Sequence, residues 1–528
     1  MKRVFYQISV TLLCGLLLAG CVNLPSPTLD PANSIPTRQV ETTSPLVTAF
    51  PATDNPTLPT TVLTGQPSQS PGTPAVSTPA PEVEDLVPAR YTLDASLDYF
   101  AHTVSVTETV SYTNTTSGSL SDLVLVVEPN RWSGCYNLIT ITWQNGDPLE
   151  DYELDKAQLR IPLPSLLAKG QSLGLRLVYL LDLPEIPAPS EEIRPVPFGY
   201  SARQINLVDW YAYVPPYQAG EGWLTHPRWG FGEHQVYDVG DYDVRLSLAE
   251  PVEDLVIAAS APATQAGEQY SYHLTAARSF ALSASNAYLV QSTSVGDVTV
   301  YSYSFSFDKA AGEQALHDTA QAVELYSSLL VPYPHATLSV VEADFLDGME
   351  YDGLFFLSRG FYNLYDGTPQ GYLTFIAAHE TAHQWWYGLV GNDQALEPWL
   401  DEAMCTYMEH IFYERVYPDY QATSGGSVLD WWWSYRVDYY EPTGWVDDAI
   451  YDFQLFRPYR DAIYLNGAKF LEDLRSLMGD QAFFEFLKDY AVSEKHKVTT
   501  ANDFFSILKR HTAQDLDGLL DAYFKTSY

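Results

Sequence analysis

The sequence is short of positive charge and of cysteine. Its 528 residues include 28 Lys and Arg against 66 Asp and Glu, which gives a formal net charge of -38 at pH 7. Such a charge repels nucleic acids, so we expect no nucleic-acid partner. The four cysteines form no C-x-x-C pair, which argues against a zinc ribbon and a disulfide framework. Phosphate-binding loops and serine nucleophile elbows are also missing from the sequence.

An apolar run at the N-terminus indicates export. Two basic residues precede a run centred on residues 12–18, which is shorter than the about 20 residues that span a bilayer. The run ends in Leu18-Ala19-Gly20-Cys21, which resembles a bacterial lipobox. We therefore expect residues 1–20 to be a signal peptide and Cys21 to carry a lipid that anchors the chain to the outer face of the cell membrane. An uncleaved spanning helix is the alternative.

The composition changes after Cys21. Residues 22–81 contain thirteen prolines and one aromatic residue, Phe50. Such a segment cannot bury a core, so residues 21–84 are predicted to be an extended tether. The remaining cysteines, Cys135 and Cys405, lie far apart in the sequence, and we expect them to be unbonded.

The remaining length predicts more than one domain. Alternating apolar residues such as Val104, Val106 and Val110, and later Tyr242 and Val244, predict an antiparallel β domain over residues 85–291. Helical patterns dominate residues 292–528. The clearest later helices are predicted over residues 465–478, 481–492 and 501–511.

The segment His379-Glu380-Thr381-Ala382-His383 predicts a metal site. Two histidines four residues apart lie on one face of a helix, so both imidazoles can contact one ion. Glu402, on a second predicted helix, completes a set of two imidazoles and one carboxylate, and this set leaves the fourth position of a zinc ion open for water. A pair of buried core histidines is the alternative. The pattern predicts one Zn²⁺ per chain, with Glu380 as the general base.

Several motifs resemble those of the gluzincin aminopeptidases, peptidase family M1. The metal-site segment is followed by Trp399-Leu400-Asp401-Glu402-Ala403, as in the family. The family's exopeptidase motif resembles Asp347-Gly348-Met349-Glu350-Tyr351. Its tyrosine segment resembles Ile463-Tyr464-Leu465-Asn466-Gly467-Ala468. The resemblance implies a saddle-like β domain followed by a mainly α, thermolysin-like catalytic domain. Because the chain ends soon after these motifs, we expect the large helical C-terminal domain of longer members to be missing and the cleft to be more open.

The resemblance also implies roles for individual residues. Glu350 would bind the free α-ammonium of a peptide by charge pairing, and Gln204 would supply a second contact from the β domain. Tyr464 would stabilise the oxyanion of the tetrahedral intermediate. The departures are Tyr351 where many relatives have Asn, Gly348 where many have Ala, and Asn466 in place of the usual Lys.

The prediction from the sequence is a zinc-dependent aminopeptidase that acts on peptides as a monomeric, membrane-anchored lipoprotein. Two alternatives remain open. One is a non-catalytic, metal-holding lipoprotein that binds peptides, although Glu380 would then have no chemical purpose. The other is a zinc hydrolase without a requirement for a free N-terminus. The aromatic run Trp431-Trp432-Trp433-Ser434-Tyr435 is interpreted as packing in preference to a substrate platform.

Overall fold

The computed structural model describes residues 87–187 and 196–528. The chain divides into two units, Met1–Ala80 and Pro81–Tyr528, and every described residue belongs to the second. The expected signal peptide, the tether and Cys21 therefore lie outside the described residues. In the described ranges, no helix combines the length and apolar character needed to cross a membrane.

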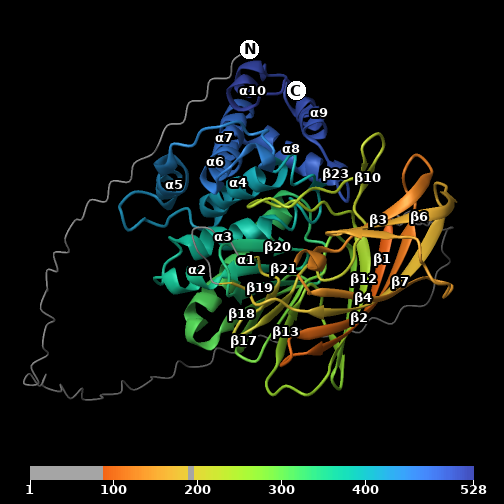
Figure 1. The fold of residues 1–528 in the computed structure, drawn as a ribbon. Coiled ribbons are helices and arrows are strands. Elements are labelled where there is room, and N and C mark those ends of the chain that lie inside the picture. The colour runs from red at the N-terminus through yellow and green to blue at the C-terminus, as the bar shows by residue number, and fades with distance from the viewer. Residues whose placement is uncertain (1–86, 188–195) are drawn as a thin grey trace, which may run out of the picture. The chain divides into compact units, whose positions relative to one another are not determined.

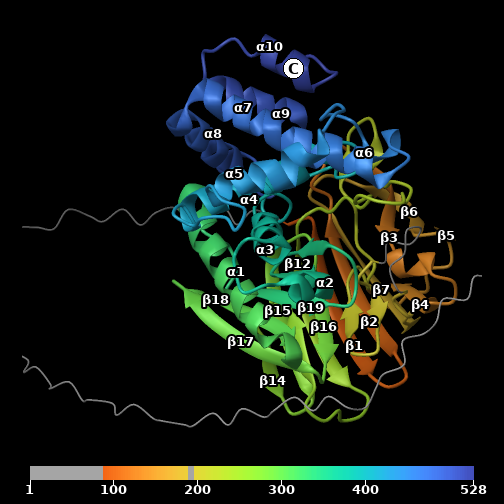
Figure 2. The ribbon, with the colours of Figure 1, turned by 90° about the vertical axis from the view of Figure 1, so that its left-hand side faces the viewer.

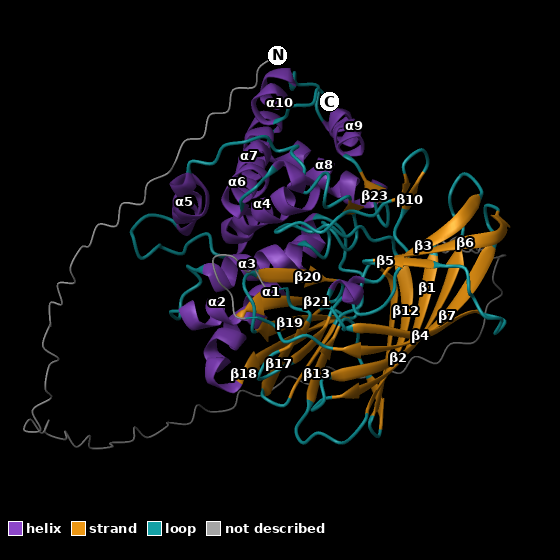
Figure 3. Ribbon diagram, in the orientation of Figure 1, coloured by secondary structure: helices purple, strands orange, loops and turns teal. Residues whose placement is uncertain are grey.

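The N-terminal domain is built from β-sheets, which lie together on one side of the helices in Figures 1 and 3. Its largest sheet has seven strands in the order β14-β15-β12-β1-β2-β7-β4. Neighbouring strands in this sheet run antiparallel except for β1 and β12, which are parallel. The strands are β1 (Ala89–Asp98), β2 (Thr103–Thr113), β4 (Tyr136–Trp143), β7 (Ser172–Asp182), β12 (Gly240–Leu248), β14 (Thr264–Ala266) and β15 (Gln269–Ala277).

Two smaller sheets complete this domain. One has the order β3-β6-β5, and the other β13-β16-β9-β8. Their strands are β3 (Leu120–Val126), β5 (Glu153–Asp155), β6 (Gln158–Leu167), β8 (Gly199–Tyr200), β9 (Ile205–Leu207), β13 (Val256–Ala259) and β16 (Leu282–Ser285). The short hairpin β10 (Tyr217–Gln218) and β11 (Gly222–Trp223) lies in the long segment that leads into β12.

The predicted alternation of buried and exposed residues is confirmed. Val104, Val106 and Val110 of β2 are buried, as are Tyr242 and Val244 of β12. Alternate side chains of a strand point to opposite faces, so these residues fill the core on one face of the sheet. Cys135 and Cys405 are both buried and unbonded, as expected.

A second, five-stranded sheet has the order β17-β18-β19-β21-β20. Its strands are β17 (Tyr288–Val295), β18 (Val298–Phe305), β19 (Thr337–Ala343), β20 (Gly348–Tyr351) and β21 (Leu354–Ser358). β20 forms one edge and pairs antiparallel with β21. The expected domain boundary between residues 291 and 292 therefore falls inside β17, and this sheet begins at Tyr288 instead.

The inner strands β19 and β21 of this sheet are buried on both faces. Phe355 and Leu357 of β21 belong to the hydrophobic core beneath the helices, whereas Leu354 and Phe356 belong to the core of the β domain. Strands covered on both faces are continuously apolar, and β21 (Leu-Phe-Phe-Leu) shows this pattern. The two domains thus share one sheet, and the position of β20 on this shared layer matters for the site.

Helices cover the other face of the shared sheet. α1 packs along β17 and β18, α3 packs on α1 and β20, and α4 packs on α3 and α7 (Figure 2). The predicted late helices are confirmed within two residues. The helices are α1 (Lys309–Leu329), α2 (Arg359–Leu364), α3 (Tyr372–Ala382), α4 (Trp399–Val416), α5 (Val428–Trp432), α6 (Phe456–Arg460), α7 (Gly467–Met478), α8 (Asp480–Ser493), α9 (Ala501–His511) and α10 (Asp517–Tyr523).

Candidate metal centre and active site

Helices α3 and α4 bring the three expected metal ligands together. His379 lies in the last turn of α3, His383 follows its end, and Glu402 lies in the first turn of α4. The Nε2 atoms of His379 and His383 are 3.2 Å and 3.6 Å from the same oxygen, Glu402 Oε2. All three side chains are buried. Two imidazoles and one carboxylate around one point are the donor set of catalytic zinc.

The outer nitrogen of each histidine has a partner. His383 Nδ1 donates to the Trp386 carbonyl at 3.1 Å, and His379 Nδ1 lies 3.0 Å from Glu409 Oε1. Glu409 is itself held by two 2.9 Å bonds from Arg436 and one of 3.0 Å from the Trp432 indole. Such partners fix the ring orientation and leave Nε2 to face the metal. Glu409 was not predicted from the sequence, although its position seven residues after Glu402 places both on one face of α4.

Glu380 lies in the same cavity as the ligands. It is buried, and its Oε2 has no hydrogen-bond partner among the described residues. A Cβ atom at Gly348 would lie 2.0 Å from Glu380 Oε1, so the carboxylate rests against the glycine backbone of β20. Burial raises the pKa of Glu380 to about 8, although the nearby His383 and His379 act in the opposite direction. A buried carboxylate with an unused oxygen and a pKa near neutrality can accept a proton.

Tyr464 enters the cavity from the π-helical segment η6 (Asp461–Asn466). Its hydroxyl donates to Glu402 Oε1, and its ring is parallel to that of His379 with centroids 6.0 Å apart. Burial raises the pKa of Tyr464 well above 10, so the hydroxyl remains a donor. Asn466, which replaces the usual Lys, donates to the Gly444 carbonyl at 2.8 Å and so fixes the loop opposite.

Glu350 faces the same cavity from the edge strand β20. Its side chain is buried and accepts a 3.2 Å hydrogen bond from Gln394 Nε2. Burial and the charge of Glu402 raise its pKa, while His383 lowers it. The cavity has a volume of about 250 Å³. It is lined by all six residues predicted for the site, namely His379, Glu380, His383, Glu402, Tyr464 and Glu350.

Residues 314–523 match the model of the Peptidase family M1 domain. This region is an M1 domain. It contains the expected metal ligands, Glu350, Glu380 and Tyr464, so the resemblance inferred from the motifs is confirmed.

The curated relatives of the M1 domain are longer proteins. Aminopeptidase M1 of Arabidopsis thaliana is 25% identical over 231 residues, which cover 40% of this chain and 25% of the relative. Aminopeptidase N of Lactococcus lactis subsp. lactis is 25% identical over 160 residues, or 28% of this chain and 18% of the relative. The aligned region thus spans a quarter or less of the length of these relatives.

Solved structures resemble a larger part of the chain. The M1 zinc metallopeptidase of Deinococcus radiodurans has a TM-score of 0.57 and 17% identity, and the match covers 83% of this chain and 94% of that one. A mutant of that protein bound to a Tyr-Ser-Ala substrate has a TM-score of 0.58. This likeness confirms the expected fold, a β domain followed by the M1 domain.

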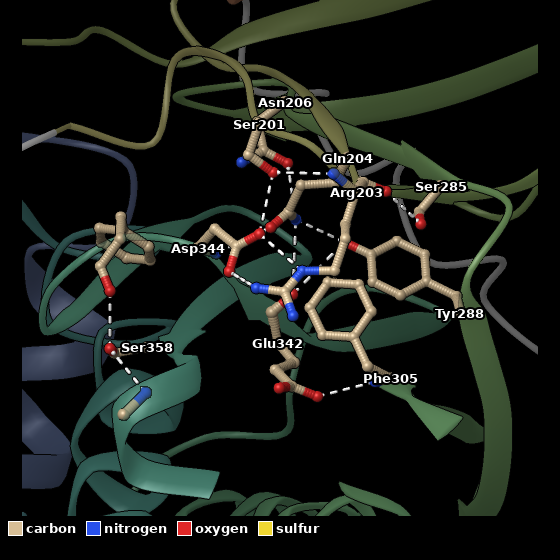
Figure 4. Close-up of polar contacts among 12 residues, drawn as sticks. Ser201, Arg203, Gln204, Asn206, Ser285, Tyr288, Phe305, Glu342, Asp344 and Ser358 are labelled. Carbon is tan, nitrogen blue, oxygen red and sulfur yellow. Dashed lines mark hydrogen bonds and ion pairs between the residues drawn. The ribbon is translucent and has the colours of Figure 1, made fainter. Parts of the chain in front are cut away.

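Gln204 does not lie in the cavity of the M1 domain. Its amide is buried, donates to the Tyr288 hydroxyl at 2.6 Å, and accepts from the Asp344 backbone at 2.8 Å (Figure 4). The neighbouring Arg203 forms an ion pair with Asp344. The prediction of an ammonium contact from Gln204 is wrong, because its polar atoms connect the β domain to the shared sheet instead.

A different residue of the β domain enters the cavity. Glu233, in the segment between β11 and β12, lines the metal cavity together with Gly232. Its carboxylate has no hydrogen bond or ion pair with any described residue. Burial, followed by the charges of Glu402 and Glu350, raises the pKa of Glu233 well above its usual range. Glu233 was not predicted from the sequence, because its segment shows neither strand nor helix periodicity.

The aromatic run next to the M1 domain's cavity is mostly packing, as expected. Trp432 is fully buried and bonds to Glu409. Trp431 stacks on Tyr435 with ring centroids 5.3 Å apart. Tyr435 is the member of the run that lines the cavity, and it is 41% exposed.

The charges of the cavity fit a bound cation. Four further acids lie near the histidines and Glu402, namely Glu233, Glu350, Glu380 and Asp401. Burial raises the pKa of Asp401 well above its usual range, and the charge of Glu402 adds to this effect. Burial acts on Glu402 in the same direction, but hydrogen bonds with the two histidines hold its pKa well below its usual range. Carboxylates therefore exceed cations here, and a divalent metal at the ligands would restore the balance.

Proposed function

We propose that the chain is a zinc-dependent aminopeptidase that removes N-terminal residues from peptides. The observation that carries the proposal is that one cavity holds three metal ligands, a buried carboxylate with a free oxygen, and a separate carboxylate on an edge strand. Curated relatives of the M1 domain are named aminopeptidases, and the similar solved structures are named zinc metallopeptidases.

His379, His383 and Glu402 would hold the zinc ion. When bound, zinc supplies a Lewis acid that lowers the pKa of water towards about 7 and polarises the scissile carbonyl. Glu380 takes the proton from the attacking water and delivers it to the leaving amine. Its unpartnered Oε2 and its pKa of about 8 suit both transfers.

Tyr464 and Glu350 act on opposite ends of the reacting unit. The Tyr464 hydroxyl exchanges its bond to Glu402 for one to the oxyanion of the tetrahedral intermediate. Glu350 pairs with the α-ammonium of the substrate, so its charge places the first peptide bond beside Glu380. A peptide with a blocked N-terminus lacks that charge and is rejected.

The proposal is tested with the full-length chain, aminoacyl chromogenic amides and their N-acetylated forms. The wild type is expected to hydrolyse the free-amine substrates and to lose activity when a chelator removes the metal. Glu380→Gln is expected to lower kcat by about 10²–10⁴-fold while it still holds one zinc per chain. Glu324→Gln, which removes an exposed charge on α1, is the matched control and should behave as the wild type.

Two outcomes would favour the alternatives. Zinc binding without hydrolysis of any peptide would indicate a metal-holding, peptide-binding protein. Equal hydrolysis of free and N-acetylated substrates would indicate a zinc hydrolase in which Glu350 does not select the N-terminus. The measurements are zinc content and initial rates on the same samples.

We also propose that the enzyme is exported and anchored as a lipoprotein. The support comes from the sequence Leu18-Ala19-Gly20-Cys21 and from the proline-rich segment that follows. Such an extended segment would let the catalytic part act at a distance from the membrane.

A further inference from the structure

A second cavity adjoins the metal cavity. It has a volume of about 150 Å³, and β20 separates the two. Glu350 lines the metal cavity, whereas Met349 and Tyr351 line the second cavity, because alternate residues of a strand point to opposite faces. Both cavities share Gly232, Glu233, Asp347 and Gly348. A ligand whose ammonium group lies at Glu350 can therefore extend past Glu233 into the second cavity.

The walls of the second cavity are mostly apolar. Trp132 and Phe198 contact each other with ring centroids 4.9 Å apart, and Phe345 and Met349 line the cavity beside them. Phe198 and Phe345 are buried. Such walls suit the methylene groups of a long side chain, which can lie on aromatic surfaces while its end remains polar.

Asp209 adds a carboxylate to these apolar walls. The Tyr237 hydroxyl donates to its Oδ1 at 2.6 Å, and its Oδ2 has no hydrogen bond or ion pair with the described residues. The other acids differ in their partners. Glu128 is already bonded to Arg131 at 2.6 Å and to His234 at 3.3 Å. Asp209 and Glu233 thus supply the carboxylate oxygens that are available to a ligand.

A cation also borders this cavity, but it lies against an aromatic ring. The Arg228 guanidinium lies 5.4 Å from the Trp132 ring centroid and is exposed. It therefore has its own favourable contact and access to water. Among the described lining residues, the carboxylates of Asp209 and Glu233, which form no ion pair, outnumber the guanidinium of Arg228.

We propose that the second cavity binds the side chain of the substrate's first residue and that Asp209, with Glu233 at the boundary, selects arginine or lysine there. This inference rests on the proposed aminopeptidase function. The α-ammonium pairs with Glu350, the stem lies between Phe198 and Met349, and the terminal cation pairs with Asp209 Oδ2. An apolar first residue would leave the Asp209 carboxylate desolvated without a partner.

The test is the ratio of kcat/KM for arginyl and lysyl amides to that for leucyl and methionyl amides, measured on the full-length chain. The wild type is expected to favour the basic residues by at least about tenfold, and Asp209→Asn is expected to lower the ratio by about 10–100-fold. Asn tolerates the left-handed backbone at this position (φ 48°) and keeps an acceptor for Tyr237. Asp254→Asn is the matched control, since Asp254 is exposed and has a similar φ of 57°.

The outcomes separate this inference from the proposed function. Hydrolysis of leucyl but not arginyl amides, or equal losses on all substrates in Asp209→Asn, would overturn the inference and leave the aminopeptidase intact. Hydrolysis of no amide would overturn the proposed function instead. In that case the melting temperature of the zinc-loaded protein is measured with L-arginine and with L-norleucine. Stabilisation by L-arginine but not by L-norleucine, and its loss in Asp209→Asn, would support the inference. Equal shifts with the two amino acids would overturn it.

Discussion

The two cavities on either side of β20 are built from different kinds of structure. The metal cavity takes the expected ligands, Glu380 and Tyr464 from α3 and its C-terminal end, α4 and η6, where regular backbone positions each side chain. The second cavity takes the two carboxylates proposed to select the side chain from segments outside regular elements, namely Asp209 after β9 and Glu233, at the boundary of both cavities, before β12. The metal cavity therefore has a rigid, locally encoded geometry, and the second cavity depends on how the β domain meets the shared sheet.

This difference suggests a division of labour. Groups that carry out bond cleavage must hold their positions closely, and helices provide that precision. Groups that select a side chain can come from connecting segments, which vary in length and composition more freely. Variants in the metal cavity should therefore change the rate for all substrates, and variants in the second cavity should change the ratio between substrates.

The largest effect in this comparison is expected for Tyr464→Phe. The change removes one oxyanion donor and should lower kcat by on the order of 10²–10³-fold for every substrate, with KM little changed. Steady-state kinetics on arginyl and leucyl amides measure it. Tyr439→Phe, which alters an exposed tyrosine outside the cavity, is the control. A change of the substrate ratio in Tyr464→Phe would contradict the separation of the two cavities.

A smaller effect is expected from Glu409→Gln, outside the ligand set. The weaker bond to His379 Nδ1 should reduce zinc affinity by about 10–100-fold, and excess zinc should restore the rate. Competition with a chromogenic chelator measures the affinity. Because Glu409 also pairs with the buried Arg436, the double variant Glu409→Gln/Arg436→Gln is needed. Full zinc affinity in the double variant would show that the single variant acts through an unpaired charge.

The smallest effect is a dependence of selectivity on pH. Burial raises the pKa of Asp209 to about 7, with the charges of Glu128 and Glu350 adding to it and the bond from Tyr237 opposing it. The carboxylate is charged above that pH and neutral below it, so the preference for arginyl over leucyl amides should fall by up to about tenfold from pH 8 to pH 6. Asp209→Asn should show a constant ratio. A ratio in the wild type that rises towards low pH would contradict this assignment.

Much of the catalytic part could be predicted from local sequence. The spacing of His379 and His383, and the position of Glu402 in the first turn of α4, place these side chains through backbone geometry. The alternation in β2 and β12 was predicted for the same reason, since strand periodicity determines which side chains share a face.

Other features needed contacts between distant segments. Gln204 was assigned to the site by motif, but its partners Tyr288 and Asp344 come from strands and loops far along the chain, and they hold it outside the cavity. The domain boundary near residue 291 was predicted from the change from strand to helix periodicity. In the structure, β17 continues across that position and joins the sheet that the two domains share. No local pattern records such long-range pairing.

The sequence by itself determined the order of the two domains and the candidates for the metal ligands and the general base, because these follow from helix and strand periods and from residue chemistry. The tertiary structure alone decided that Glu409 orients His379, that Glu233 and Asp209 face the cavities, and that Gln204 does not. Each of these depends on contacts between segments far apart in the sequence. Glu409 meets His379 where α4 packs on α3, and Glu233 and Asp209 reach the cavities from the β domain.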